Sequence, residues 1–118
     1  MDKKQKQYVE CAATLLPVRD ALEALSGKWR LPIIISISQG NKRFREIERS
    51  IPKITTKVIA KELKELEQHR FIKRTVYDTF PVKIEYTLQP YAYSLANVIE
   101  VLKEWGINHR KEISKIDK

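Results

Sequence analysis

The sequence has few of the residues on which disulfide, metal or phosphate-loop chemistry depends. Cys11 is the only cysteine among 118 residues, which excludes an internal disulfide and a cysteine-rich zinc site. The two histidines, His69 and His109, are far apart and have no cysteine or histidine partner at metal-ligand spacing. Only three glycines are present, and they form no glycine-rich phosphate loop. We therefore expect no metal and no cofactor.

Long apolar runs, a targeting segment and a catalytic set are also missing. No apolar stretch approaches the roughly 18–20 residues that a membrane-spanning helix needs. The N-terminal residues carry charge but have neither a sustained apolar segment nor a convincing signal-peptide cleavage site. No nucleophile has a base at motif spacing, and no carboxylate pair lies in an evident cleft. These absences predict a cytoplasmic domain with no membrane partner that is not an enzyme.

Positive charge, in contrast, is abundant and unevenly placed. The formal net charge is +8, and residues 40–88 hold twelve basic and seven acidic side chains, which is more than half of the surplus. A basic surplus is compatible with nucleic acid, with an anionic membrane surface, or with solubility alone. Charge by itself does not choose among these partners.

The spacing of apolar residues predicts five helices and one hairpin, in the order α-α-α-α-β-β-α. The first helix is expected to start at Pro17 and to be ended by Gly27. The apolar run over residues 28–41 fits a buried strand or a buried helix. We interpret it as a helix because Pro32 is tolerated in a first turn and Gly40 begins a stop signal.

Two further helices are predicted over residues 44–51 and 54–69, where apolar residues recur every three or four positions. Thr55 is a candidate N-cap for the second of them, which is the fourth helix of the chain. The period then changes to two, so residues 71–88 are predicted to form a hairpin with turn residues at its centre. A long helical pattern begins at Tyr91 and continues toward the C-terminus.

The fourth predicted helix has two distinct faces. Ile59, Leu63 and Leu66 share one face and are expected in the core. Small, hydroxyl and cationic side chains occupy the other face and the N-terminal end, namely Thr55, Thr56, Lys57, Ala60, Lys61 and Lys64. Small residues permit close approach, hydroxyls bond phosphates or base edges, and ammonium groups neutralise phosphates. A short helix, a turn and such a helix follow the order of a helix-turn-helix, whose second helix enters the major groove.

Cations also flank this helix along the chain. They are Lys42, Arg43 and Arg45 around the start of the third helix, and Lys73, Arg74 and Lys83 in the hairpin. Three basic elements close together in fold order favour nucleic acid over solubility alone.

Structural explanations for several of these residues stay open. Arg74 could pair with Glu85 across the hairpin, and Lys83 and Glu85 could be the solvated face of a two-stranded sheet. Glu62 and Glu65 on the fourth helix are interpreted as solvated charges. The two tryptophans, Trp29 and Trp105, are interpreted as packing anchors.

Seven short motifs occur in order along the chain. They are Gly27-Lys28-Trp29, G-x-x-R-F-x-E-I at 40–47, I-P-x-I-T-x-K at 51–57, L-K-E-L-E at 63–67, R-T-V-Y at 74–77, P-x-x-x-E-Y-x-L at 81–88 and Glu104-Trp105-Gly106. Together they resemble the HxlR family of bacterial winged helix-turn-helix transcription regulators, which are relatives of the MarR group. The resemblance covers about Pro17 to Gly106, which is nearly the whole domain.

The resemblance implies an α+β, mainly α fold, a winged helix-turn-helix with a long C-terminal dimerisation helix. Residues 1–16 would form a partly flexible N-terminal arm or helix, and residues 17–106 the DNA-binding domain. Residues 89–118 would form a helical dimerisation region continuous with that domain. The implied function is transcription regulation by a homodimer that binds a pseudo-palindromic operator in double-stranded DNA. The fourth helix would then be the recognition helix and residues 71–88 the wing.

The expected DNA contacts fall into groups. Those expected to reach base edges or nearby phosphates are Thr56, Lys57 and Lys61. Those expected on the backbone are Lys64, Arg45 and Arg49, and those that place the wing are Arg74 and Lys83. Thr55 and Ala60 complete the DNA-binding set. The expected dimer interface consists of Leu15, Leu16, Leu95, Val98, Ile99, Leu102 and Trp105.

One position departs from the family pattern. Members often have a cysteine, followed by proline, about a dozen residues before the Lys-Trp pair, and some use it to sense oxidants or electrophiles. Leu16 stands at that place here, before Pro17, and Cys11 lies five residues earlier. Cys11 is therefore a candidate redox sensor that lacks the motif position, and a plain thiol is the alternative.

A protein and a small molecule are possible partners beside DNA. The alternative function is a non-enzymatic domain that binds protein through the same winged-helix surface, and a steep salt dependence of binding would favour nucleic acid instead. The small-molecule partner would be an unidentified effector, since the sequence leaves open whether a ligand sets the affinity for DNA.

Overall fold

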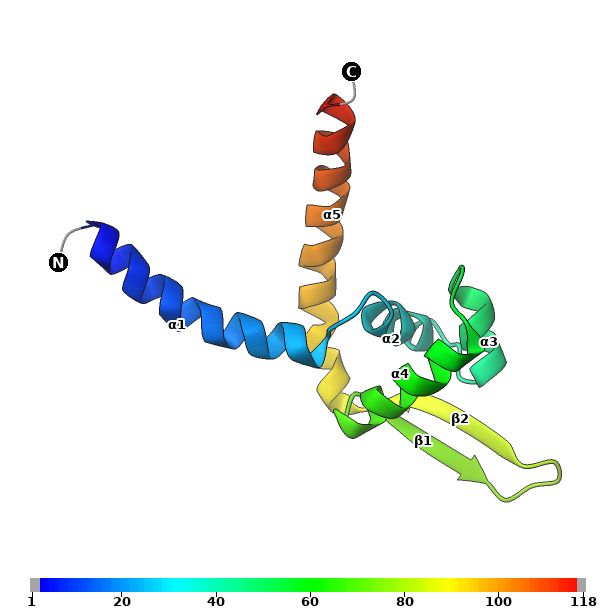
Figure 1. The fold of residues 1–118 in the computed structure, drawn as a ribbon. Coiled ribbons are helices and arrows are strands. Elements are labelled where there is room, and N and C mark those ends of the chain that lie inside the picture. The colour runs from blue at the N-terminus through cyan, green and yellow to red at the C-terminus, as the bar shows by residue number, and fades with distance from the viewer. Residues whose placement is uncertain (1–2, 117–118) are drawn as a thin grey trace.

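A computed structural model describes the backbone of residues 3–116 and the side chains of residues 13–115 (Figure 1). The elements in chain order are α1 (Lys3–Ala24), α2 (Arg30–Ser38), α3 (Phe44–Ser50), α4 (Thr56–Gln68), β1 (Ile72–Tyr77), β2 (Lys83–Leu88), the 3-10 helix η1 (Pro90–Leu95) and α5 (Ala96–Ile116). The order is the predicted one, with η1 added at the start of the last helix. The mainly helical α+β fold, with a small sheet and a long C-terminal helix, is therefore confirmed.

The first helix is longer than the sequence suggested. It begins at Lys3, so the expected start at Pro17 is wrong, and Pro17 lies inside the helix. Proline is favoured at a first helical position but is not restricted to it, since a long helix can lose one backbone hydrogen bond. Gly27 lies in the turn that follows, with a positive φ of 86° that suits glycine.

The apolar segment after that turn is a helix, as interpreted from Pro32, which lies in the first turn of α2. Polar contacts fix the next helix against it. The hydroxyl oxygens of Ser36 and Ser50 are 2.6 Å apart, and Asn41 Nδ2 donates to the Ser36 carbonyl at 3.1 Å. Ser36 is buried, and its hydroxyl oxygen is bonded both to the Ser50 hydroxyl and to Asn41 Nδ2, which donates to it at 3.2 Å. These partners satisfy a hydroxyl that would otherwise be costly to bury.

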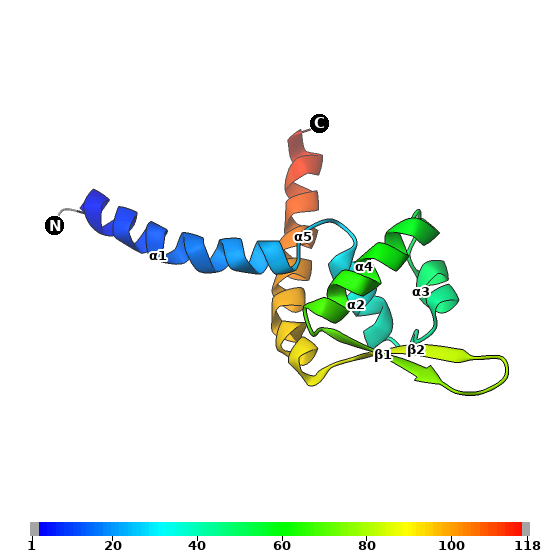
Figure 2. The same cartoon turned by 60° about the horizontal axis from the view of Figure 1, so that its bottom comes forward.

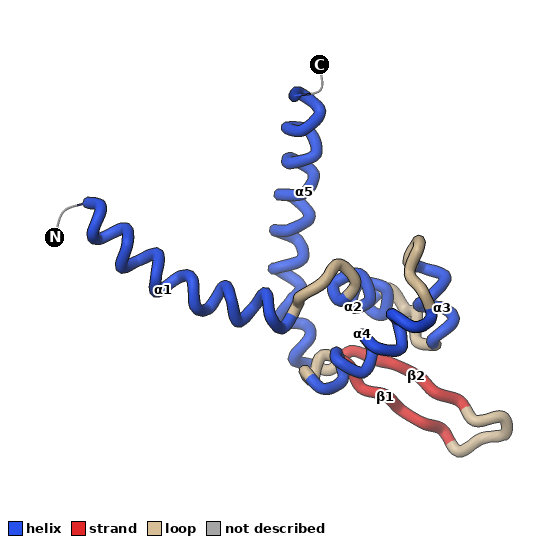
Figure 3. Tube along the Cα trace, viewed as in Figure 1, coloured by secondary structure: helices blue, strands red, loops and turns tan. Residues whose placement is uncertain are grey.

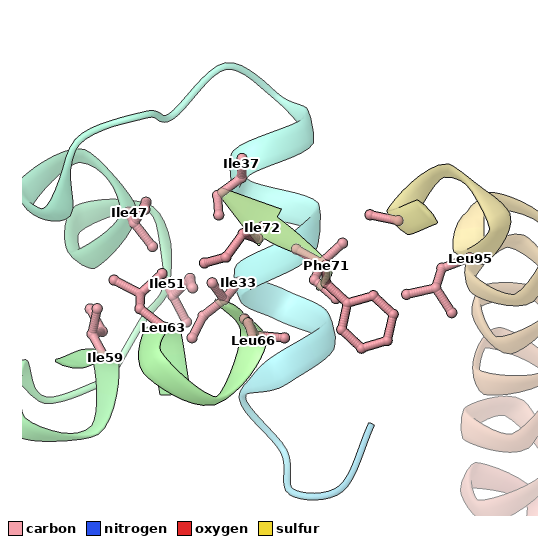
Figure 4. Close-up of a cluster of buried hydrophobic side chains, with 12 residues drawn as sticks. Ile33, Ile37, Ile47, Ile51, Ile59, Leu63, Leu66, Phe71, Ile72 and Leu95 are labelled. Carbon is pink, nitrogen blue, oxygen red and sulfur yellow. The ribbon is translucent and has the colours of Figure 1, made fainter. Parts of the chain in front are cut away.

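The core lies where α2, α3, α4 and the start of β1 meet (Figure 4). Ile59, Leu63 and Leu66 of α4 are almost fully buried in one cluster with Ile33 of α2, as the helical spacing predicted. Its remaining members are Ile34, Ile37, Ile47, Ile51, Phe71, Ile72, Ala92 and Leu95. Burial of this set on one side of α4 leaves the opposite side of the helix facing outward.

The two strands form an antiparallel hairpin (Figure 3). Arg74 lies opposite Tyr86, and Thr75 lies opposite Glu85. The alternative that Arg74 pairs directly with Glu85 across the hairpin is therefore wrong, because the register is shifted by one residue. The Tyr86 N–H donates to the Lys42 carbonyl at 2.7 Å, which ties the hairpin to the turn before α3.

Two helices project from this unit. Figures 1 and 2 show α1 and α5 extending away from the helices and hairpin that share the core. The radius of gyration is 18.4 Å, whereas a compact domain of this length would have about 13–14 Å. The excess comes from helices that have little of their own chain beside them.

Candidate nucleic-acid interface

The outward face of α4 carries the predicted small and cationic side chains. Lys57, Ala60, Lys61 and Lys64 are all exposed. Thr55 is the N-cap, as predicted, since its hydroxyl oxygen accepts a hydrogen bond from the Val58 N–H at 3.2 Å. The Thr55 side chain is therefore engaged in capping the N-terminal end of the helix.

An arginine holds the inner side of α4 in place. Arg30 Nε donates to Glu62 Oε2 at 2.9 Å, and the two side chains are only 11% and 15% exposed. Arg30 Nη1 donates to the Ala24 carbonyl at 2.8 Å, at the end of α1. The interpretation of Glu62 as a solvated charge is wrong, because burial beside α2 gives it a partner. Glu65 is more exposed, and its Oε2 lies 3.7 Å from Arg30 Nη2.

The start of α3 is fixed by an acidic residue of the F-x-E-I motif. Glu46 Oε1 accepts hydrogen bonds from the backbone N–H groups of Arg43 and Lys42, at 3.0 and 3.1 Å. These two bonds lower the pKa of the Glu46 carboxyl. The predicted phosphate ligands Arg45 and Arg49 are exposed on this helix.

A second acidic residue of α3 reaches the first turn of α4. Glu48 Oε2 accepts a hydrogen bond from the Thr56 hydroxyl, with 2.5 Å between the oxygens. Its other oxygen, Oε1, lies 3.4 Å from Arg45 Nη1. Sequence reasoning did not find this residue, because nothing in the spacing of eight positions between Glu48 and Thr56 indicates contact across the turn.

The hairpin and α4 form a cleft. It has a volume of about 360 Å³ and is lined by Ala60, Leu63, Lys64, Glu67, Gln68, Arg74 and Tyr86. The predicted backbone ligand Lys64 and the predicted wing residue Arg74 are thus brought together. The loop of the hairpin lies on the same side of the molecule as α3 and the N-terminal end of α4 in Figures 1 and 2.

Lys83 has neighbours of its own on the hairpin. Its Nζ lies 3.7 Å from Glu85 Oε2 and 5.3 Å from the centre of the Tyr77 ring. A hydrogen bond to Glu85, with the charge of that carboxylate, raises the pKa of the Tyr77 hydroxyl. Lys83 and Glu85 share one face of the sheet, as the structural explanation suggested, but both are half-buried, so its description of that face as solvated is wrong.

The predicted dimer residues differ in exposure. Leu95 is buried in the core of its own chain, and Ile99 is half-buried against that core. The others are exposed, namely Leu15, Leu16, Val98, Leu102 and Trp105. Trp105 is 63% exposed and stacks on His109, with 4.7 Å between ring centres. Its interpretation as a packing anchor is therefore wrong within one chain, while Trp29 is half-buried against the core.

An apolar groove opens beside this exposed surface. It has a volume of about 410 Å³ and is lined by Leu31, Ile35, Gln39, Ile99, Glu100, Leu102 and Lys103. The groove thus joins α2 of the core unit to the projecting helix α5.

The side chain of Cys11 lies outside the described residues, so its proposed redox role stays a prediction from sequence. Within the part of the chain that the structure describes, no group of three or more histidine, cysteine, aspartate or glutamate side chains could hold a metal ion. None of the described helices combines the length and the apolar character that crossing a bilayer requires.

Comparisons with known proteins agree with this geometry. The HxlR-like helix-turn-helix family matches residues 24–114. An uncharacterised HTH-type transcriptional regulator of Bacillus subtilis strain 168, YtcD, is 39% identical over 94 residues, which are 80% of this chain and 75% of that protein. The crystal structure of YtcD superposes with a TM-score of 0.75, covering 80% of this chain and 96% of that one. The redox regulator HypR in its reduced form is 33% identical, with a TM-score of 0.77 over 84% of this chain and 98% of its own.

Proposed function

The chain belongs to the HxlR-like helix-turn-helix family of DNA-binding transcription regulators, and from that premise we propose that it binds a pseudo-palindromic operator as a homodimer. In each protomer α4 is the recognition helix, which lies in a major groove, and the β1–β2 hairpin is the wing. The proposed action is binding without catalysis.

The observation that carries the proposal is the outward face of α4. Lys57, Ala60 and Lys61 are exposed on the side of the helix opposite its buried leucines and isoleucine. A face of this kind combines close approach with cations that neutralise phosphate. Lys64 and Arg74 line the cleft between helix and wing, so the positive surface continues from one element to the other.

The contacts are assigned by position on this surface. Thr56, Lys57 and Lys61 reach base edges or nearby phosphates from the N-terminal half of α4. Lys64, Arg45 and Arg49 contact the backbone. Arg74 and Lys83 place the wing, although the ion pair of Lys83 with Glu85 leaves Arg74 as the stronger candidate.

The homodimer is supported by the projecting helices. Exposed leucines on α1 and an exposed tryptophan and leucine on α5 leave apolar surface that one chain does not cover. A two-fold dimer would bury the same surface of both chains. It would place two recognition helices at half-sites about one turn of DNA, roughly 34 Å, apart.

The test is selection of bound fragments from random duplex DNA, followed by titration of the selected site with variants. We expect a sequence with two-fold symmetry. Lys57→Ala and Lys61→Ala should each weaken binding by roughly 1–3 kcal/mol if they contact bases. If they contact phosphate, each substitution should reduce the slope of log affinity against log salt concentration by about one, which is one counterion fewer released.

Lys111→Ala, on the exposed C-terminal half of α5, is the matched control for loss of one lysine. It should leave operator affinity unchanged at moderate salt. Unaltered binding by both α4 variants would show that this helix is not the reader.

A further inference from the structure

Glu48 lies between two residues that are proposed to contact DNA. It belongs to α3, and its side chain is 21% exposed. Its carboxylate accepts a hydrogen bond from the Thr56 hydroxyl, with 2.5 Å between the two oxygens. The contact with Arg45 is longer, at 3.4 Å, and the arginine is 75% exposed. An exposed ion pair of that kind contributes little, so the contact that matters is the one with Thr56.

The hydrogen bond changes what Thr56 can recognise. A hydroxyl has one proton to donate and two lone pairs that accept. The Thr56 hydroxyl uses its one proton in the hydrogen bond that it donates to the Glu48 carboxylate. Hydrogen bonds to ionised acceptors are short and strong. The hydroxyl therefore presents only acceptor capacity toward a ligand at the first turn of α4.

Acceptor capacity selects among DNA groups. Phosphate oxygens, guanine O6 and N7, and thymine O4 are themselves acceptors, so they offer no proton to this hydroxyl. The exocyclic amino groups of adenine and cytosine are the donors in the major groove. Each can donate to Thr56 Oγ1 while the hydroxyl still donates to Glu48.

We propose that Glu48 is a positioning residue that sets base preference, because it makes Thr56 an acceptor that selects adenine or cytosine on one strand. The inference rests on the proposed function, since it requires α4 to lie in the major groove. At that base position guanine and thymine place an acceptor against an acceptor, which is unfavourable.

The charge of Glu48 gives the proposal a distinctive signature. A carboxylate beside a DNA-facing helix repels phosphates, so it lowers affinity for every sequence. Removing it should raise affinity for unrelated duplex DNA and, at the same time, reduce discrimination at one base position. Damage to the fold would lower both the affinity for unrelated DNA and the base discrimination. A rise in the first with a fall in the second therefore distinguishes loss of Glu48 from misfolding.

The experiment measures operator affinity with each of the four bases at every position, at one salt concentration, for the parent and several variants. In the parent we expect adenine or cytosine to be preferred at one position of each half-site. Glu48→Ala and Thr56→Val should each reduce that preference roughly threefold to tenfold, the range of one net hydrogen bond. The double variant should lose no more than either single variant, because both remove the same interaction.

Two conservative variants sharpen the result. Glu48→Gln keeps an oxygen that accepts the hydroxyl proton, so it should retain the preference while affinity for unrelated DNA rises. Thr56→Ser keeps the hydroxyl and should also retain the preference. Glu112→Ala removes an exposed carboxylate of α5, so it controls for net charge and should leave base preference unchanged.

The outcomes separate this inference from the function on which it rests. If Glu48→Ala has the parental preference at every position, the inference is overturned while operator binding stands. If Glu48→Ala does not fold, the comparison of Thr56→Val with Thr56→Ser decides, and equal preference in the two would overturn it. A parent that selects no sequence would instead remove the proposed function.

Discussion

The winged unit, residues 30–95, and the projecting helices α1 and α5 differ in the burial of their apolar residues. In the winged unit, isoleucines and leucines from α2, α3 and α4 are buried against one another. On α1 and α5, leucines, valines and a tryptophan stay largely exposed. The same apolar spacing therefore has two meanings, a core in one region and an uncovered surface in the other.

The difference shows where each region obtains its stability. The winged unit buries its apolar residues within one chain, so it should be stable at any protein concentration. The projecting helices can bury theirs only against another molecule, so their order should depend on concentration. Arg30 joins the two regions, because it bonds carbonyl oxygens at the end of α1 and a carboxylate of α4.

The largest effect is expected from a core leucine. Leu66→Ala removes a fully buried side chain of α4, and a leucine-to-alanine change in a core costs about 2–5 kcal/mol of unfolding free energy. Urea denaturation followed by circular dichroism would measure it. Leu22→Ala, on the exposed surface of α1, is the matched change in the other region.

The loss of unfolding free energy caused by Leu22→Ala should be small in dilute solution and should grow with protein concentration. Equal, concentration-independent losses for both leucines would mean that the two regions do not differ.

The next largest effect concerns assembly. Trp105 is exposed on α5, and buried tryptophans contribute strongly at interfaces. Trp105→Ala should weaken dimerisation roughly 30-fold, or about 2 kcal/mol, as a hot-spot residue would. Sedimentation equilibrium over a range of concentrations would measure the change.

The same variant should leave the unfolding free energy of the monomer nearly unaltered. A parent chain that stays monomeric at high concentration would contradict the assignment of α5 to a dimer.

A smaller effect is expected at the junction of the two regions. Arg30→Met leaves the half-buried Glu62 carboxylate without its 2.9 Å partner. Loss of one partner of such a pair should destabilise the protein by about 1–3 kcal/mol. Arg19→Met, on the exposed surface of α1, removes an equal charge and should change stability little. If both variants melt alike, Arg30 does not connect α1 to α4.

Sequence patterns predicted what depends on local spacing. The buried face of α4 follows from apolar residues three and four positions apart, and the N-cap role of Thr55 follows from its place before that pattern. The hairpin follows from the change of period after α4. These features need no knowledge of how distant segments pack.

Other features depend on contacts between segments and were missed. The partner of Glu62 is Arg30, 32 positions earlier, and neither residue carries a local signal of the pairing. The exposure of Trp105 was also missed. A tryptophan in an apolar stripe gives the same sequence pattern whether it packs within its own chain or against another chain. The pairing of Glu48 with Thr56 is a third case, because it depends on the angle between α3 and α4.

The smallest effect should come from acidic pH acting on the winged unit. Hydrogen bonds from Arg43 and Lys42 lower the pKa of Glu46 below the ordinary value of 4.5. A lowered folded-state pKa stabilises the fold above the unfolded value, and this contribution is lost as pH falls through the folded-state value. Unfolding free energy should therefore fall more between pH 7 and pH 3 in the parent than in Glu46→Gln, which cannot titrate there. Glu104→Gln, on the exposed surface of α5, is the matched control for replacing one exposed glutamate by glutamine. Parallel pH profiles for the parent and Glu46→Gln would mean that Glu46 does not fix the start of α3.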